Sequence, residues 1–313
     1  MSPGSAAYDI TRAVADSTYE KFGTLAKYLG KPIEEWLQPW LMHRKVKYEM
    51  RDKIIAEATK EQIAVMRQDH EWNLEDRASE RCRREEIRRQ QNIENIVVSS
   101  VEQIPSDQTP IQINDDWSAQ FIENCKDISD ETMQKLWSKI LAGELSKPGS
   151  CSLKTMAILR TMNKSDAELF STLKSFVWES AESQYIVINF EKMRIYSNNA
   201  IFQNFDYNSL IDLEHFGLIH LSTPATIIQS YNEFSSVSWR YFDKSIKLTK
   251  RNSTGNPTGS NLKIDVGEVH LTKSGKDLMR LVSGNPMDSY IEAAVKYFQS
   301  RFLNVQFEPQ SSP

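Results

Sequence analysis

The residues best suited to chemistry lie near the C-terminal end of the chain. Asp265, Glu268 and His270 fall on one predicted strand, and a carboxylate beside an imidazole can bind a metal ion or transfer a proton. Because side chains alternate along a strand, Glu268 and His270 share a face and Asp265 lies on the other. Two groups without a third partner are weak evidence for a catalytic site, so a structural role is the simpler interpretation.

Motifs typical of bound phosphate, dinucleotide or zinc do not occur in the sequence. It contains neither a G-x-x-x-x-G-K-[ST] nor a G-x-G-x-x-G pattern, and no H-E-x-x-H. Cys82, Cys125 and Cys151 are too far apart for a zinc motif. His215 and His220 flank a predicted helix end, where structural histidines are the simpler interpretation. We predict no catalytic residue, no cofactor and no metal, and therefore not an enzyme.

Composition and charge exclude several classes of protein. The chain has 313 residues with 38 basic and 42 acidic side chains, a net charge of -4, so charge alone does not predict nonspecific nucleic-acid binding. No apolar run approaches the ~20 residues that cross a bilayer, and the N-terminus lacks a signal peptide pattern. Three widely spaced cysteines argue against a disulfide framework. We expect a cytoplasmic protein.

The N-terminal segment shows helical periodicity. Gly30 is expected to end one helix and Pro32 to begin the next. Trp36 and Trp40 then lie one helical turn apart, as in helices that rest on a membrane surface. Two neighbouring glutamates oppose contact with anionic lipid, so we favour an aromatic contact between helices. Peripheral membrane or partner contact through these tryptophans is the alternative.

A long helical arm is predicted next. No Pro or Gly occurs between Leu41 and Ser99, and 24 of the 51 residues from Leu41 to Gln91 are charged. One continuous helix of that length would reach roughly 80 Å at 1.5 Å per residue. A monomer would not bury such a helix, so we expect it to pair with another copy or to fold back as a hairpin. The sequence therefore predicts a homo-oligomer.

A basic cluster lies within this arm, formed by Arg81, Arg83, Arg84, Arg88 and Arg89. Such a cluster could contact phosphates of nucleic acid or lipid. The alternative, which we favour, is a solvated helix surface partly neutralised by neighbouring glutamates.

Domain boundaries follow from composition and periodicity. A polar segment bounded by Pro105 and Pro110 predicts a hinge. We expect helices and the arm in residues 1–102, a linker in 103–114, a helical core in 115–180 and an α+β module in 181–313. The core includes a predicted capping box from Ser165 to Glu168. Its most regular buried stripe is Met133, Leu136, Trp137, Ile140 and Leu141.

The C-terminal module mixes strands and helices. Its order resembles a winged helix, in which one helix reads DNA and a hairpin touches the backbone. The candidate helix carries Asp212 and Glu214 but no Lys or Arg. The hairpin is modestly basic at its tip, with Lys247, Lys250, Arg251 and Lys263. We expect this module to contact protein. Strands are predicted at 185–190, 193–196, 218–221, 237–249 and 262–271, and helices at 207–216, 272–282 and 287–302. The fold class is mainly α with a C-terminal α+β part.

One stretch resembles a known family. Trp117, the segment Asp127–Trp137, the run Ile140–Glu144 and the turn Lys147–Ser150 are similar to Domain of Unknown Function 2806, an uncharacterised bacterial family distantly similar to abortive-infection alpha proteins. The resemblance implies a bacterial cytosolic protein connected with anti-phage defence. It supplies no catalytic residue.

Together these observations predict a non-catalytic oligomeric interaction or sensor protein, with a phage or host protein as its partner. The alternative is a nucleic-acid-binding regulator that uses the arginine cluster and the hairpin tip.

Overall fold

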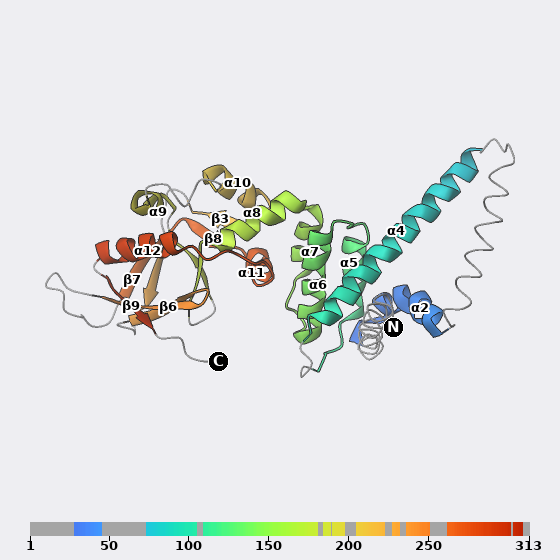
Figure 1. Cartoon of the computed structure of the whole chain (residues 1–313), viewed down its shortest axis with the longest axis horizontal. Coiled ribbons are helices and arrows are strands. Elements are labelled where there is room, and N and C mark those ends of the chain that lie inside the picture. Colours follow the sequence, from blue (N-terminus) through green and yellow to red (C-terminus); the bar gives the residue numbers. More distant parts are fainter. Residues whose placement is uncertain are drawn as a thin grey trace, which may run out of the picture. The chain divides into compact units, whose positions relative to one another are not determined.

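The structure is a computed structural model that describes residues 28–45, 73–104, 109–180, 184–188, 190–197, 205–222, 227–231, 236–250, 262–301 and 303–308. It divides into two compact units, residues 1–160 and residues 161–313 (Figure 1). The first unit is helical, and the second contains an antiparallel sheet of five strands with helices. A helix-rich chain with a C-terminal α+β part is therefore confirmed.

Five helices make up the described part of the first unit. Helix α4 packs mainly against α6, and α2 packs against α5. The predicted stripe of α6 is confirmed, because all five of its apolar side chains are buried. The helices are α2 (Lys31–Lys45), α4 (Leu74–Glu102), α5 (Asp115–Cys125), α6 (Glu131–Ser146) and α7 (Leu153–Thr161).

Polar side chains fix where these helices begin. Asn73 and Asp76 form a capping box at the start of α4, and Asn114 and Asp130 cap α5 and α6. Each cap satisfies backbone N–H groups that have no partner within the helix. In the second unit, the box that opens α8 (Lys164–Lys174) is formed by Asn163 and Asp166. The capping box predicted at Ser165 is therefore wrong by two residues.

The expected linker at 103–114 lies inside the first unit. The Ile111 N–H donates to the Leu145 carbonyl at 2.7 Å, and the Ile113 N–H donates to the Tyr28 carbonyl at 2.9 Å. Residues 105–108 lie outside the described part. The boundary between units falls near residue 160 instead, so the helical core expected at 115–180 is divided between them, with α8 in the second.

The main sheet of the second unit is antiparallel throughout, in the order β2-β1-β5-β6-β9. Its aromatic core includes Trp178 and Tyr241, whose ring centroids lie 5.0 Å apart, and Trp239 packs edge-on against Phe298 of helix α12 (Asp288–Ser300). The strands are β1 (Val177–Ser180), β2 (Tyr185–Val187), β5 (Ser236–Tyr241), β6 (Lys244–Lys250) and β9 (Leu303–Glu308).

Two smaller ladders complete the described part of the second unit. Strand β3 pairs with β8, and β4 pairs with β7. Their bounds are β3 (Ile219–Leu221), β4 (Ile227–Tyr231), β7 (Leu262–Gly267) and β8 (Val269–Leu271), and the remaining helices are α9 (Phe190–Ser197), α10 (Tyr207–His215) and α11 (Lys273–Met279).

Buried tyrosines hold the turn between α8 and β1. The Tyr241 hydroxyl donates to the Ser175 carbonyl at 2.7 Å and accepts from the Met287 N–H at 3.0 Å. The Tyr290 hydroxyl donates to the Phe176 carbonyl at 2.8 Å. Burial raises the pKa of Tyr241 to about 12, so these hydroxyls remain neutral donors.

Three predictions for the second unit are wrong. Residues 193–196 belong to helix α9, where the helix-favouring Lys192, Met193 and Arg194 outweigh the two residues that follow. The helix predicted to reach residue 302 ends at Ser300, and β9 follows. The strands that flank residues 251–260 do not form a hairpin, because β6 pairs with β5 and β9 while β7 pairs with β4. The winged-helix interpretation stays a prediction.

Candidate interaction surface on helix α4

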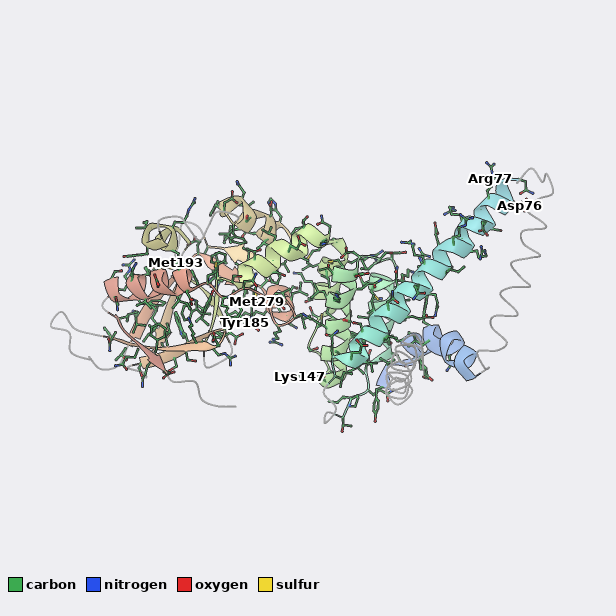
Figure 2. The ribbon with its side chains drawn as sticks, viewed as in Figure 1. Asp76, Arg77, Lys147, Tyr185, Met193 and Met279 are labelled. Atoms are coloured by element: carbon green, nitrogen blue, oxygen red, sulfur yellow. The ribbon has the colours of Figure 1, made fainter. Side chains whose placement is uncertain are left out.

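Helix α4 is divided into an exposed half and a buried half. From Leu74 to Gln91 no side chain is buried, and this exposed half extends beyond α5 and α6, with Asp76 and Arg77 near its far end (Figures 1 and 2). The second half packs into the helical unit. Its buried residues are Asn92, Ile93, Ile96, Val97, Ser100 and Val101.

Ion pairs along the helix accompany this exposure. Glu80 binds Arg83 at 2.8 Å and Arg84 at 2.7 Å, and Arg81 binds Glu85 at 3.1 Å. Hydrogen bonds from Arg83 and Arg84 lower the pKa of Glu80 to about 2. Pairs at three- and four-residue spacing stabilise a solvated helix. The exposed half can therefore remain helical in solvent without burying an apolar face, unlike the helix expected from the sequence.

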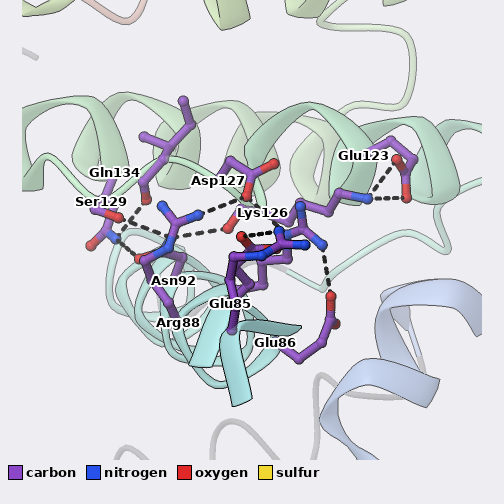
Figure 3. A network of polar contacts seen from close by, with 12 residues as sticks. Glu85, Glu86, Arg88, Asn92, Glu123, Lys126, Asp127, Ser129 and Gln134 are labelled. Carbon is purple, nitrogen blue, oxygen red and sulfur yellow. Dashed lines mark hydrogen bonds and ion pairs between the residues drawn. The ribbon is translucent and has the colours of Figure 1, made fainter. Parts of the chain in front are cut away.

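Two arginines attach the base of the exposed half to the rest of the unit. The carboxylate of Asp127, which follows α5, accepts from Arg88 at 3.2 Å and from Arg89 at 2.9 Å (Figure 3). Arg89 also binds Glu86 at 2.7 Å. The bond from Arg89 is the main reason that the pKa of Asp127 is lowered, so this contact is charged at neutral pH.

A buried amide network lies next to these ion pairs (Figure 3). The Asn92 amide donates to the Lys126 carbonyl at 2.9 Å and to the Ser129 hydroxyl at 3.2 Å. The Gln134 amide donates to the Asn92 side-chain oxygen at 3.1 Å and to the Ile128 carbonyl at 2.9 Å. Buried polar groups that are fully paired fix one arrangement of their elements, and here they fix α4 against α6.

All five arginines of the predicted basic cluster form ion pairs in the structure. The predicted cluster does not include Arg77. This residue joins Arg81, Arg84 and Arg88 at spacings of four, three and four residues. Residues so spaced lie along one helix face, and these four line an open groove together with Glu80 and Glu85. The spacing alone could have identified this arginine stripe, which we define as Arg77, Arg81, Arg84 and Arg88.

The predicted hairpin residues belong to the second unit. Lys250 is the last residue of β6, is partly exposed and lies opposite Leu303 of β9. Arg251 lies outside the described residues. The other two residues of the expected tip, Lys247 of β6 and Lys263 of β7, lie in strands that do not pair with each other.

The apolar face of α2 is largely covered by its own unit. Ile33 and Leu37 are buried, while Trp36 is partly exposed and its carbonyl accepts from the Gln90 amide at 2.8 Å. The side chain of Trp40 lies outside the described part. Among the described helices, none has the length and apolar composition that would let it cross a membrane.

The predicted pair of Glu268 and His270 does not form a site. Glu268 is buried whereas His270 is exposed. Glu268 lies between the end of β7 at Gly267, whose φ is 98°, and the start of β8 at Val269, so it does not belong to the alternation of either strand. Asp265 accepts from the Gly267 N–H at 3.1 Å and lies near Arg301. Within the described ranges, no three His, Cys, Asp or Glu side chains are grouped to hold a metal ion.

A buried carboxylate connects two of the segments that carry the resemblance to a known family. Glu144 accepts from the Gly149 N–H at 2.7 Å, from the Ser150 hydroxyl at 3.1 Å and from the Cys151 N–H at 3.3 Å. The Trp117 indole donates to the Cys151 carbonyl at 3.0 Å. The bonds from Gly149 and Ser150 join Glu144 to the segment Lys147–Ser150 at the turn between α6 and α7.

Comparison with known proteins agrees with the resemblance seen in the sequence. Residues 76–295 match the family described as a protein of unknown function (DUF2806). The search of curated proteins and the search of solved structures each gave no match. Because the match spans most of the chain, from the exposed half of α4 to α12, this protein belongs to the DUF2806 family.

Proposed function

We propose that this protein is a non-catalytic interaction protein that self-associates through the exposed half of α4. The observation that carries the proposal is the helix itself, which has no buried side chain from Leu74 to Gln91 and is held at its base by Asp127 and the amide network. A surface that is solvated along its length and rigid at its base is suited to presenting side chains to a partner.

Charge complementarity favours a second copy in antiparallel orientation. In a two-fold pair each contact occurs twice. If the helices cross at Cys82, Glu75 of one copy faces Arg89 of the other, because both residues lie seven positions from Cys82 and share its helix face. Opposite charges therefore meet on both sides of the crossing, which favours this register.

The side chains at the crossing are small. Glu75, Cys82 and Arg89 are spaced by seven residues and so share a helix face, and Ala78 lies on the same side. Ala78 and Cys82 allow the two backbones to approach closely, while the ion pairs lie toward the ends.

Crosslinking at Cys82 tests this arrangement directly. Cys82 is exposed whereas Cys125 and Cys151 are buried, so a short bis-maleimide should join two copies through Cys82. We expect a dimer mass by light scattering and a covalent dimer that disappears in Cys82→Ser. A monomer mass at all concentrations, with no covalent dimer, would contradict the proposal.

Charge reversal tests the register. Glu75→Lys should place a lysine opposite Arg89 of the second copy and weaken the dimer at low salt. Glu102→Lys is the matched control, since Glu102 is an exposed glutamate at the other end of the same helix. Equal effects of the two reversals would exclude this register.

A second candidate function is nucleic-acid binding, which the arginine stripe favours. Arg77→Gln combined with Arg81→Gln removes half of the stripe and spares Arg88, which binds Asp127. Labelled DNA and RNA should then bind more weakly, with a shallower dependence of affinity on salt. Lys154→Gln, at an exposed lysine of α7, serves as the control. Absence of binding at ~50 mM salt would exclude this function.

The similarity to abortive-infection alpha proteins extends the first proposal to anti-phage defence, with a phage or host protein as the partner. Plaque counts on cells that express the wild type or Glu75→Lys test this extension. Protection that requires Glu75 would support it, and equal plaque counts with and without the protein would contradict it.

A further inference from the structure

Two histidines face each other across the small ladder of the second unit. His220 of β3 and His270 of β8 are directly opposite partners in an antiparallel pair. Both side chains are exposed, whereas their neighbours on each strand are buried. Directly opposite residues have Cβ atoms about 4.5–5.5 Å apart, so the two imidazoles extend from the same outer face at a short separation.

Glu214 of α10 orients one of these rings. Its Oε1 lies 3.2 Å from Nδ1 of His220 and also accepts from the Leu221 N–H at 2.7 Å. The backbone bond fixes the carboxylate, which in turn favours a proton on Nδ1 and leaves Nε2 as a lone-pair donor. A carboxylate bound to the second ring nitrogen is the usual arrangement behind a histidine that binds a metal.

We propose that His220 and His270 bind one Zn²⁺ or a similar first-row transition-metal ion through one nitrogen each. No cluster of three His, Cys, Asp or Glu is positioned as a metal cage in the described part of the chain, so water completes the coordination sphere and Glu214 acts as the outer partner. The ion would join β3 to β8, the strands that adjoin α10 and α11.

Zinc titration of the full-length protein tests the site. A Cys82→Ser background removes an exposed thiol that could take the same ion. Calorimetry with Zn²⁺ should show one site, and His220→Ala and His270→Ala should each weaken it more than tenfold. His215→Ala, on α10 and also solvent-exposed, is the matched control and should bind as the parent does.

Glu214→Gln tests whether Glu214 positions His220 for metal binding without being required for folding. Glutamine retains an acceptor for the Leu221 N–H, so the thermal melt should stay close to that of the parent. Affinity for Zn²⁺ should nevertheless fall about 10- to 100-fold, the usual effect of losing an outer partner. Unchanged Zn²⁺ binding in both histidine variants, or equal loss in His215→Ala, would overturn the proposal.

Discussion

The Arg89 guanidinium lies 2.9 Å from the carboxylate of Asp127, a residue 38 positions further along the chain. The ion pairs of Arg81, Arg83 and Arg84 join residues of the same helix, whereas this contact and that of Arg88 join α4 to the segment after α5. Asp127 therefore marks the point where α4 changes from a solvated helix to a packed one.

Removal of the Asp127 carboxylate should loosen the base of α4. Asp127→Asn is expected to lower the free energy of unfolding by up to about 1 kcal/mol, because the pair is partly exposed to solvent. The folded state lowers the pKa of Asp127, so its contribution is complete above the unfolded value of about 3.9 and is lost as pH falls through the lower folded value. Urea denaturation at neutral pH and at strongly acidic pH measures both effects; Glu168→Gln, at a weaker exposed pair, is the control.

The buried amide network should contribute more than the ion pairs. Gln134→Ala leaves the Asn92 side-chain oxygen and the Ile128 carbonyl without this donor, and an unpaired buried polar group costs about 1–3 kcal/mol. Gln91→Ala removes an exposed bond to Asn95 and should change stability by less than about 0.5 kcal/mol. Similar urea midpoints for the two variants would refute a structural role for the network.

Glu144 should be required for the turn between α6 and α7. Its side chain is buried and accepts three hydrogen bonds, and bonds to a charged group contribute about 1.5–3 kcal/mol each. Glu144→Ala should therefore lower the melting temperature of the first unit strongly, and Glu144→Gln should lower it less. Differential scanning calorimetry checks the order, and an unchanged melt in Glu144→Ala would be inconsistent with the hydrogen bonds seen here.

Two helical glycines should respond in opposite ways to substitution by alanine. A Cβ on Gly275 of α11 would lie 1.9 Å from the Leu218 carbonyl oxygen, whereas a Cβ on Gly143 of α6 would meet only the Ser150 hydroxyl at 3.4 Å. Gly275→Ala should destabilise the second unit by about 3 kcal/mol or more. Gly143→Ala should be neutral or stabilise α6 by up to about 1 kcal/mol, and chemical denaturation distinguishes the two.

The second unit should lose stability on mild acidification. His270 has a lowered pKa in the folded state, so the unfolded chain binds a proton first as pH falls below about 6.5. Stability is therefore complete above that value and declines as pH approaches the lower folded value. His270→Gln should reduce the loss of stability between about pH 7.5 and about pH 5.5, and an identical loss in both proteins would contradict it.

Local patterns predicted the helical unit well. The apolar spacing from Met133 to Leu141 specified the buried face of α6, because that information lies within one helix. The partner of Arg89 was not predictable, since Asp127 is brought close only by packing of α4 against α6. The hairpin predicted across residues 251–260 failed for the same reason, because β6 pairs with β9, which lies far along the chain. The two-residue alternation failed at Glu268 because the predicted single strand is broken there, between Gly267, which has a positive φ, and Val269.

The division of α4 implies that its N-terminal end can unfold locally, whereas its C-terminal end unfolds only with the rest of the unit. Near Leu74 a turn can fray by releasing its cap and a few surface ion pairs, whereas opening near Val101 requires the helical unit to unfold. A protease that cleaves after arginine would then cut at Arg77 long before it cut at Arg89. Such a cut would separate α2 from the rest of the chain, and the two fragments would then be held together by the packing of α2 against α5.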